Sequence, residues 1–151
     1  MVILSNLVKS KVSPDFIDLI NKLFYKQGIV MVWDKDTKYN LYKTDMKTPI
    51  ASFNMFLYKI KLDNNLVDSV AFTDFTPELK YRNRTIIRGI FEQITKCSDT
   101  TKTSVILSAS DFIDSTLKFK EDNLISLGFT SKSILDLSGI KSNFEYIRIP
   151  A

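Results

Sequence analysis

One feature of the sequence constrains the fold of this chain most. It is an apolar run, followed by a basic segment and then by the pattern of an amphipathic helix. Residues 66–75 have the composition of a strand, and the segment after them carries apolar residues at i, i+1, i+4, i+5 and i+8: Ile86, Ile87, Ile90, Phe91 and Ile94. That spacing places the five side chains on one helical face, which must pack against something apolar. The pattern therefore predicts a helix that follows a strand directly and lies on a sheet.

Basic residues at this connection predict an anion site. Arg82, Arg84 and Arg88 lie around the expected start of the helix. The free N–H groups at a helix start and the positive end of its dipole both favour phosphate. The three arginines and the backbone amides of residues 83–88 are therefore candidates to bind a diphosphate. The alternative is a basic first turn that simply faces water.

Composition narrows the classes of protein. With 151 residues, 44% hydrophobic and 25% charged, the chain is expected to be a single folded domain over 1–151. No apolar run approaches the roughly 20 residues of a membrane span, and the N-terminus lacks the basic start of a signal peptide. Cys97 is the only cysteine, which fits a reducing compartment, so we expect a cytoplasmic protein without membrane association.

The absence of histidine excludes whole classes of site. There can be no Ser-His or Cys-His nucleophile and no histidine-based metal site, and we expect no metal. Any general base must be a carboxylate, a tyrosine, a lysine or a water molecule. The net charge of +4 permits an anionic ligand without requiring one.

Local signals predict the other elements. Ser13-Pro14 starts a helix over 15–27 that Gly28 ends, and Asp63-Asn64-Asn65 joins strands 49–61 and 66–75 as a hairpin. Further strands are expected at 2–8, 29–33, 104–108, 134–137 and 144–149, with 39–42 a short strand or a loop, and another helix from Asp111 to Leu127. Because a helix separates strands 66–75 and 104–108, these two should be parallel neighbours. The expected fold is α/β (α+β), a mixed central sheet of about six to seven strands flanked by about three to four helices.

The connection after the strand resembles the central motif of the GNAT superfamily of acyl-CoA N-acyltransferases. That motif is a strand, Pro-Glu-Tyr, and then Arg/Gln-x-x-Gly-x-Gly/Ala at the start of a helix. Pro77-Glu78 matches its first part and Arg82 the leading Arg/Gln, while Thr85 and Ile87 occupy the two glycine positions. A Cβ at either position narrows the approach of backbone amides to a pyrophosphate.

The element order also resembles that of the family over nearly the whole chain. Leu127-Gly128-Phe129 is similar to the end of the family's last helix. Leu124 stands where the family often has a tyrosine that protonates the departing thiolate. The resemblance implies an N-acetyltransferase that transfers an acetyl (acyl) group from acetyl-CoA to a primary amine, by direct attack in a ternary complex.

The resemblance also assigns roles to residues. Asp68 or Asp74 would take the proton of the amine, with Asp68 expected to be partly buried beside Val70 and Phe72. The residues implied to bind the cofactor are Ala71, Phe72 and Thr73 along the pantetheine arm, and Arg82, Asn83, Arg84, Thr85, Ile86, Ile87 and Arg88 around the pyrophosphate.

Two other classes stay open. One is a catalytically inactive GNAT-fold binding or scaffold protein. The other is a basic nucleic-acid-binding domain, in which Phe56 and Tyr58 would stack bases while Lys59 and Lys61 met phosphates. We expect a small-molecule or peptide amine as the acceptor, a nucleic acid only in this last class, and a monomer or a homodimer.

Overall fold

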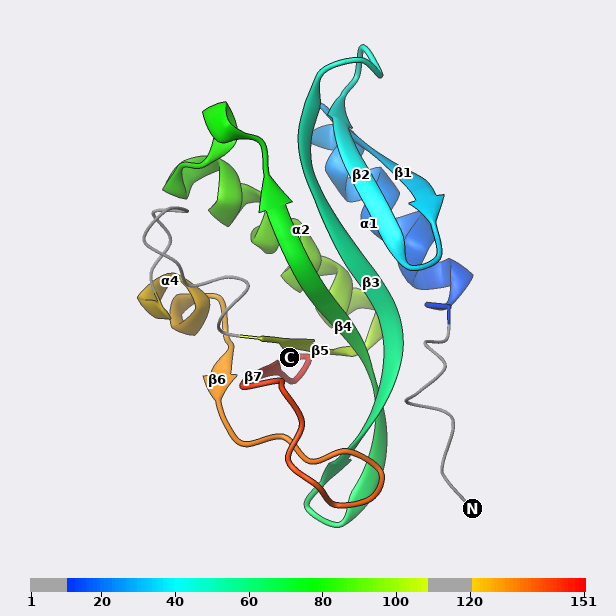
Figure 1. The fold of residues 1–151 in the computed structure, drawn as a ribbon, viewed down its shortest axis with the longest axis vertical. Coiled ribbons are helices and arrows are strands. Elements are labelled where there is room, and N and C mark those ends of the chain that lie inside the picture. The colour runs from blue at the N-terminus through cyan, green and yellow to red at the C-terminus, as the bar shows by residue number, and fades with distance from the viewer. Residues whose placement is uncertain (1–10, 109–120) are drawn as a thin grey trace.

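The computed structural model describes residues 11–108 and 121–151. An open, mixed seven-stranded sheet in the order β1-β2-β3-β4-β5-β7-β6 runs through these residues and carries three helices, as Figure 1 shows. This confirms the α+β fold with a mixed central sheet. The strand predicted at 2–8 and the first part of the helix predicted from Asp111 lie outside the described residues.

The first four strands form an antiparallel meander, and the chain crosses to the rest of the sheet by way of a helix. The strands are β1 (Ile29–Lys35), β2 (Lys38–Lys43), β3 (Pro49–Leu62), β4 (Asn65–Pro77), β5 (Ser104–Leu107), β6 (Thr130–Ser131) and β7 (Tyr146–Arg148). The helices are α1 (Pro14–Lys26), α2 (Arg84–Thr101) and α4 (Glu121–Ser126), with a 3-10 turn η2 (Leu79–Tyr81) before α2. β4 and β5 pair in parallel, as predicted, and 39–42 belongs to a strand.

Local signals account for α1 and for the β3–β4 turn. The Ser13 hydroxyl accepts a hydrogen bond from the Phe16 N–H at 3.4 Å, and Gly28 adopts φ +78°, where a glycine is needed to end the helix. Asp63 and Asn64 both have positive φ, 50° and 66°. Two such residues form the turn type whose twist matches an antiparallel hairpin.

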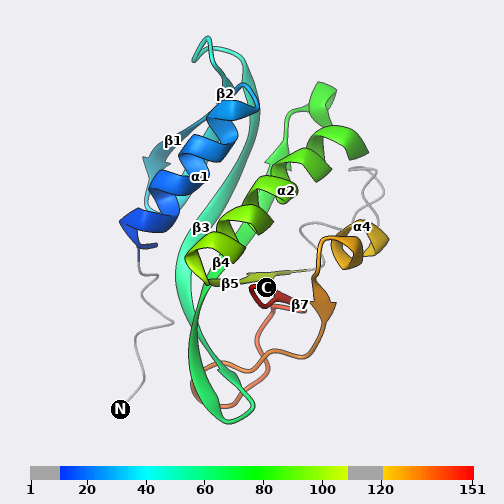
Figure 2. The same ribbon diagram turned by 180° about the vertical axis from the view of Figure 1, so that it is seen from behind.

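Two hydrophobic clusters lie on opposite faces of the sheet. Helices α1 and α2 lie side by side on one face, as Figure 2 shows from behind. Their apolar stripes meet Phe53, Phe72 and Phe75 of the sheet there. On the other face, near the β3–β4 turn, the segment around Ile134 and Phe144 covers a smaller cluster. The two helices thus bury their sheet face except near the β3–β4 turn, and described parts of the chain bury only the lower end of the other face.

The strand predicted at 134–137 is wrong. Leu135 forms only isolated bridges, to Lys61 and to Lys141, and the sixth strand is the two-residue β6 instead. The carboxylate of Asp136 accepts hydrogen bonds from the N–H groups of Ser138 and Ile140, at 2.8 and 3.1 Å. This local turn ends the extended conformation before it can become a strand.

Arg148 of β7 and Asp99 near the end of α2 form a bidentate ion pair. Their N···O distances are 2.5 and 3.0 Å, and Asp99 also accepts the N–H of Ala151 at 2.8 Å. The Nε of Arg148 donates to the carbonyl of Leu127 at 2.7 Å. The pair therefore joins α2 to β7 and to the chain end at Ala151, and Arg148 also connects it to the end of α4 at Leu127.

We expect this ion pair to make the stability of the protein depend on pH. The hydrogen bonds from Arg148, and then the one from the Ala151 N–H, hold the pKa of Asp99 below its usual value. The stability that they contribute is therefore full above the unfolded-state pKa of about 4, and is lost as the pH falls through the lower folded-state value. The free energies of unfolding of wild type and Asp99→Asn, measured with urea, should differ most near neutral pH. The difference between them should become smaller in acid. A difference in free energy of unfolding that does not change with pH would show that the Asp99–Arg148 ion pair does not cause the pH dependence.

Candidate functional site

β4 and β5 pair over only part of β4. Ser69 to Phe72 pair with Ser104 to Leu107, and β4 continues past this ladder to Pro77. From Thr73 on, the β5 side of β4 has no strand partner among the described residues. Of the three residues predicted along the pantetheine arm, Ala71 and Phe72 are buried within the ladder, and Thr73 is half-buried at its end. A strand edge without a partner can pair with an extended ligand, and among the described residues that edge begins at Thr73.

A β-bulge lies at this point of β4. Ser52 pairs with Thr76 but Asn54 pairs with Thr73, so β4 has one more residue than β3 between the two pairs. Asp74 lies in this bulge with φ +54°. Its Oδ2 accepts hydrogen bonds from the Asn54 side chain at 2.5 Å and from the Thr73 hydroxyl at 3.3 Å. Bulges redirect a side chain beside active sites, and this one presents an exposed carboxylate that Asn54 holds in place.

Asp68, the other predicted base, lies elsewhere. It is exposed opposite Lys59, near the β3–β4 turn, so its predicted partial burial is wrong. The helices cover the sheet at Val70 and Phe72 but end short of the hairpin tip, as Figures 1 and 2 show. At about 3.3 Å per residue, Asp68 is about 20 Å from Asp74 along the strand. The two carboxylates therefore cannot act at one site.

Among the described residues, the start of α2 has donors that remain available to an anion. Asn83 is the N-cap, and its Oδ1 accepts the N–H of Ile86 at 3.0 Å, while the N–H of Ile87 bonds the Asn83 carbonyl at 3.1 Å. Within the described residues, the N–H groups of Arg84 and Thr85 have no acceptor. Unpaired amides and the dipole of an 18-residue helix both favour a negative group here.

The two residues at the predicted glycine positions differ in where they point. Ile87 is 1% exposed and packs in the core, so its side chain faces away from the helix entrance. Thr85 is exposed, whereas Ile86 packs partly against the core. Only Thr85 therefore adds bulk on the outer side of the first turn.

The three predicted arginines all make contacts within the protein. Arg82 precedes the helix, and its Nε donates to the Pro77 carbonyl at 3.1 Å. The Nε of Arg84 donates to the Asn123 side chain at 2.8 Å. Arg88 donates to the Asn123 carbonyl at 3.3 Å and to the Ser126 hydroxyl at 2.7 Å. Arg84 and Arg88 thus connect the start of α2 to α4.

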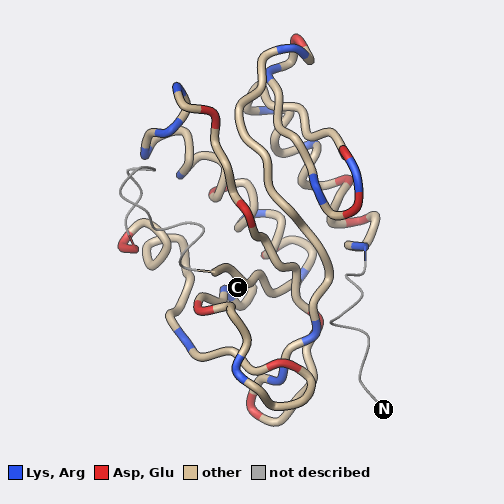
Figure 3. The backbone as a smooth tube through the Cα atoms, in the orientation of Figure 1, with Lys and Arg blue, Asp and Glu red and all other residues tan. Residues whose placement is uncertain are grey.

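Two lysines extend the positive charge beside this entrance. The Nζ atoms of Lys43 and Lys80 lie 5.7 and 5.2 Å from the centre of the Tyr81 ring. Figure 3 shows blue segments both at the β4–α2 connection and at the β2–β3 loop beside it. The Tyr81 hydroxyl is buried without a hydrogen-bond partner among the described residues. The approach to α2 is therefore mainly cationic, with Glu78 and Glu92 as its nearest acids in sequence.

Most of the surface predicted to stack bases is covered by other parts of the chain. Phe56 is 3% exposed, and the Tyr58 ring packs edge-on against Phe144 with ring centres 5.0 Å apart. The chain before β7 covers Phe56 and packs against the half-buried Tyr58, so the strand face proposed for a nucleic acid is part of the second hydrophobic cluster. That prediction for Phe56 and Tyr58 is wrong.

Sequence reasoning missed Asn54 and Asn123, which hold Asp74 and Arg84. Asn54 alternates with the core residues Phe53 and Met55, a pattern that places it on the opposite strand face. Nothing in the sequence pairs it with Asp74, since that contact depends on the bulge. Asn123 is 4% exposed beside the buried Leu124, and no local signal marks it as a partner of an arginine 39 residues away.

No three metal-binding side chains come together in the described part of the chain. The helices described there are also too short or too polar to span a bilayer. No protein-family model and no curated protein matches this sequence.

Proposed function

We propose that this protein is a GNAT-like N-acetyltransferase, which transfers an acetyl (acyl) group from acetyl-CoA to a primary amine. The observation that carries the proposal is the bulge at Asp74. It lies where β4 leaves its parallel partner β5, on the strand that leads directly into the open start of α2. Among the described residues, one short stretch of chain thus offers an unpaired strand edge, a carboxylate held by Asn54 and a helix start that can bind an anion.

The phosphates of the coenzyme would bind at the start of α2. The free N–H groups of Arg84 and Thr85 would donate to phosphate oxygens, and the guanidinium of Arg84 and the ammonium of Lys80 would supply charge. The inward direction of Ile87 supports this fit, because its Cβ leaves the entrance open without a glycine. Thr85 is compatible as well, since its hydroxyl can itself donate to an oxygen.

The chemical step requires only a proton acceptor and a hydrogen-bond donor from the protein. The amine nitrogen bonds to the acetyl carbonyl carbon, the carbon–sulfur bond breaks, and the sulfur leaves as a thiolate that takes a proton from water. Asp74 would accept the proton that the amine loses, directly or through a water molecule. An N–H group on the free edge of β4 would donate to the carbonyl oxygen as negative charge develops there.

A scaffold protein without catalysis is the second candidate. Leu124, in the place of the family's tyrosine, is 0% exposed, so no side-chain acid stands at that position for the thiolate. A binding protein would need the phosphate site but not the carboxylate. Acetyl-CoA binding without transfer to any of a panel of primary amines would favour this candidate.

Calorimetric titration with acetyl-CoA tests the phosphate site. Wild type is expected to bind, and Arg84→Glu to weaken binding about tenfold or more, because one charge-assisted contact contributes about 1.5–3 kcal/mol. Lys96→Glu is the matched control: it makes the same charge change on the exposed side of the same helix, about 18 Å along the axis from Arg84. Absence of binding at millimolar coenzyme, or equal weakening by both variants, would reject the proposal.

A further inference from the structure

Three polar side chains form a row across the sheet face that the helices leave open. Lys38 of β2 pairs with Asn54 of β3, which pairs with Thr73 of β4. Paired residues on neighbouring strands point to the same face, so these side chains lie opposite the α1–α2 side of the sheet. Asp74 joins the row because its carboxylate accepts the Asn54 amide. We refer to Lys38, Asn54, Thr73 and Asp74 as the polar row.

The polar row has a cation at one end and an anion at the other. Lys38 and Asp74 are two strand spacings apart, about 10 Å. Asn54 between them is fixed, because its Oδ1 accepts the Thr37 hydroxyl at 3.1 Å while its Nδ2 donates to Asp74. Asp74 is exposed and Lys38 half-buried, so both ends are open to a ligand.

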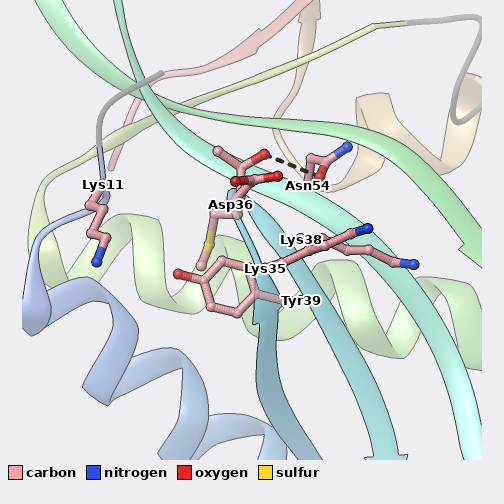
Figure 4. A pocket seen from close by; sticks show the side chains of 8 residues that line it. Lys11, Lys35, Asp36, Lys38, Tyr39 and Asn54 are labelled. Carbon is pink, nitrogen blue, oxygen red and sulfur yellow. Dashed lines mark hydrogen bonds between the residues drawn. The ribbon is translucent and has the colours of Figure 1, made fainter. Parts of the chain in front are cut away.

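A pocket of about 610 Å³ lies beside the lysine end, shown in Figure 4, and its lining includes Lys11 and the core-facing Tyr39 and Met55. The tip of the β1–β2 hairpin forms one wall, and Asn54 and Met55 of β3 form another. Lys35, the β1 partner of Lys38, extends in the same direction as Lys38, and both point away from Lys11. The two lysine side chains thus extend away from the Lys11 side of the pocket, toward the face of the polar row.

The two hairpin lysines are available to an anion. Lys38 lies 3.7 Å from Asp34, in an exposed ion pair of the kind that contributes little. Lys35 has no charged partner among the described residues. Lys11, by contrast, lies over the Trp33 ring at 5.9 Å. Asp34 and Asp36 lie on the same hairpin, but among the described residues only Asp34 pairs with one of these lysines, and both lysine side chains extend in the same direction.

We propose that the amine acceptor is a small zwitterion, with a carboxylate or phosphate bound by Lys35 and Lys38 and its amino group beside Asp74. This inference rests on the proposed transferase function, to which it adds the acceptor class. The charges of such a molecule complement the row at both ends, whereas a simple alkylamine complements only Asp74. A molecule spanning the row also places its nitrogen at the bulge, where β4 parts from β5.

A pair of acceptors of equal chain length tests this assignment. We expect kcat/KM for 6-aminohexanoate to exceed that for hexylamine at least about tenfold, because one added charge-assisted contact has about that effect. An aminoalkyl phosphate of similar length shows which anion is preferred. Lys38→Glu should reduce the ratio of the two kcat/KM values to about one or below, while the Lys96→Glu control keeps the wild-type ratio. Equal rates for both amines in wild type would overturn the acceptor class.

A binding measurement separates this inference from the proposed function. Amide resonances of Lys38, Asn54 and Asp74 should shift saturably when 6-aminohexanoate is titrated into ¹⁵N-labelled protein, and should not shift in Lys38→Glu. Acetylation of amines without such shifts would overturn the zwitterion site and leave the transferase standing. Saturable shifts without acetylation of any amine would leave a zwitterion site and reject its role as an acceptor site. Neither shifts nor acetylation would reject both.

Discussion

Replacing Phe91 with alanine is expected to lower the free energy of unfolding by about 3–5 kcal/mol, because the change removes a large buried side chain and leaves a cavity. Phe91 is 0% exposed on the core face of α2. Its ring meets that of Phe75 edge-to-face, with centres 5.5 Å apart. Since domains of this size are stable by about 5–15 kcal/mol, the variant should lose a large part of its stability. Urea unfolding followed by circular dichroism measures the change.

The control is a leucine that is close in sequence but not in the core. Leu79 in η2 is 82% exposed, so Leu79→Ala should change the free energy of unfolding by no more than about 0.5 kcal/mol. Phe75 follows the bulge residue Asp74 directly, so Phe91 also supports the strand at the candidate site. A loss of less than about 1 kcal/mol in Phe91→Ala would show that α2 does not pack as described.

The elements that the sequence predicts well are those set by a few neighbouring residues. Ser13-Pro14 and Gly28 define α1, and Asp63-Asn64 can take the left-handed conformation that the β3–β4 turn requires. The parallel pairing of β4 and β5 follows from a general rule, because a strand, a helix and a second strand of one sheet are joined by a crossover. Each of these predictions needs no knowledge of distant contacts.

Predictions that depend on distant contacts succeed less often. The apolar residues at 134–137 have a strand-like composition, but the Asp136 turn directs Ile134 into the second cluster without a ladder. Asp68 has the alternation of a core-facing position, yet the helices do not reach it. Strand periodicity gives the face of a side chain but not whether another element covers that face.

The candidate site shows the same limit. Arg84 and Arg88 are recognisable as basic residues at a helix start, but their contacts with Asn123 depend on how α4 packs. The bulge at Asp74 contains no glycine, the residue that would be expected at a positive φ. Its position therefore cannot be predicted from the sequence. The sequence therefore indicates the segment of the candidate site, and the structure shows which of the two carboxylates lies beside it.

Asp74→Asn is expected to lower kcat for acetyl transfer by about 100-fold to 10,000-fold, the contribution typical of a positioned general base. Asparagine has nearly the shape of aspartate and tolerates the left-handed conformation found here, φ +54°, so the bulge should persist. Its side-chain oxygen can still accept the hydrogen bond from Asn54, but it cannot take a proton from the amine. Steady-state release of the coenzyme thiol measures kcat, and calorimetry checks that acetyl-CoA still binds.

Asp68→Asn is the matched control, because it makes the same change on the same strand about 20 Å away. The exposed Asp68 should leave kcat within about twofold of wild type. If Asp68→Asn slowed transfer more than Asp74→Asn, the base would lie near the hairpin end and the bulge would have only a structural role. If both variants kept full activity, solvent would accept the proton and the protein would act only by positioning its two substrates. A loss confined to Asp74→Asn, with acetyl-CoA binding intact, would place the proton transfer at the bulge of β4.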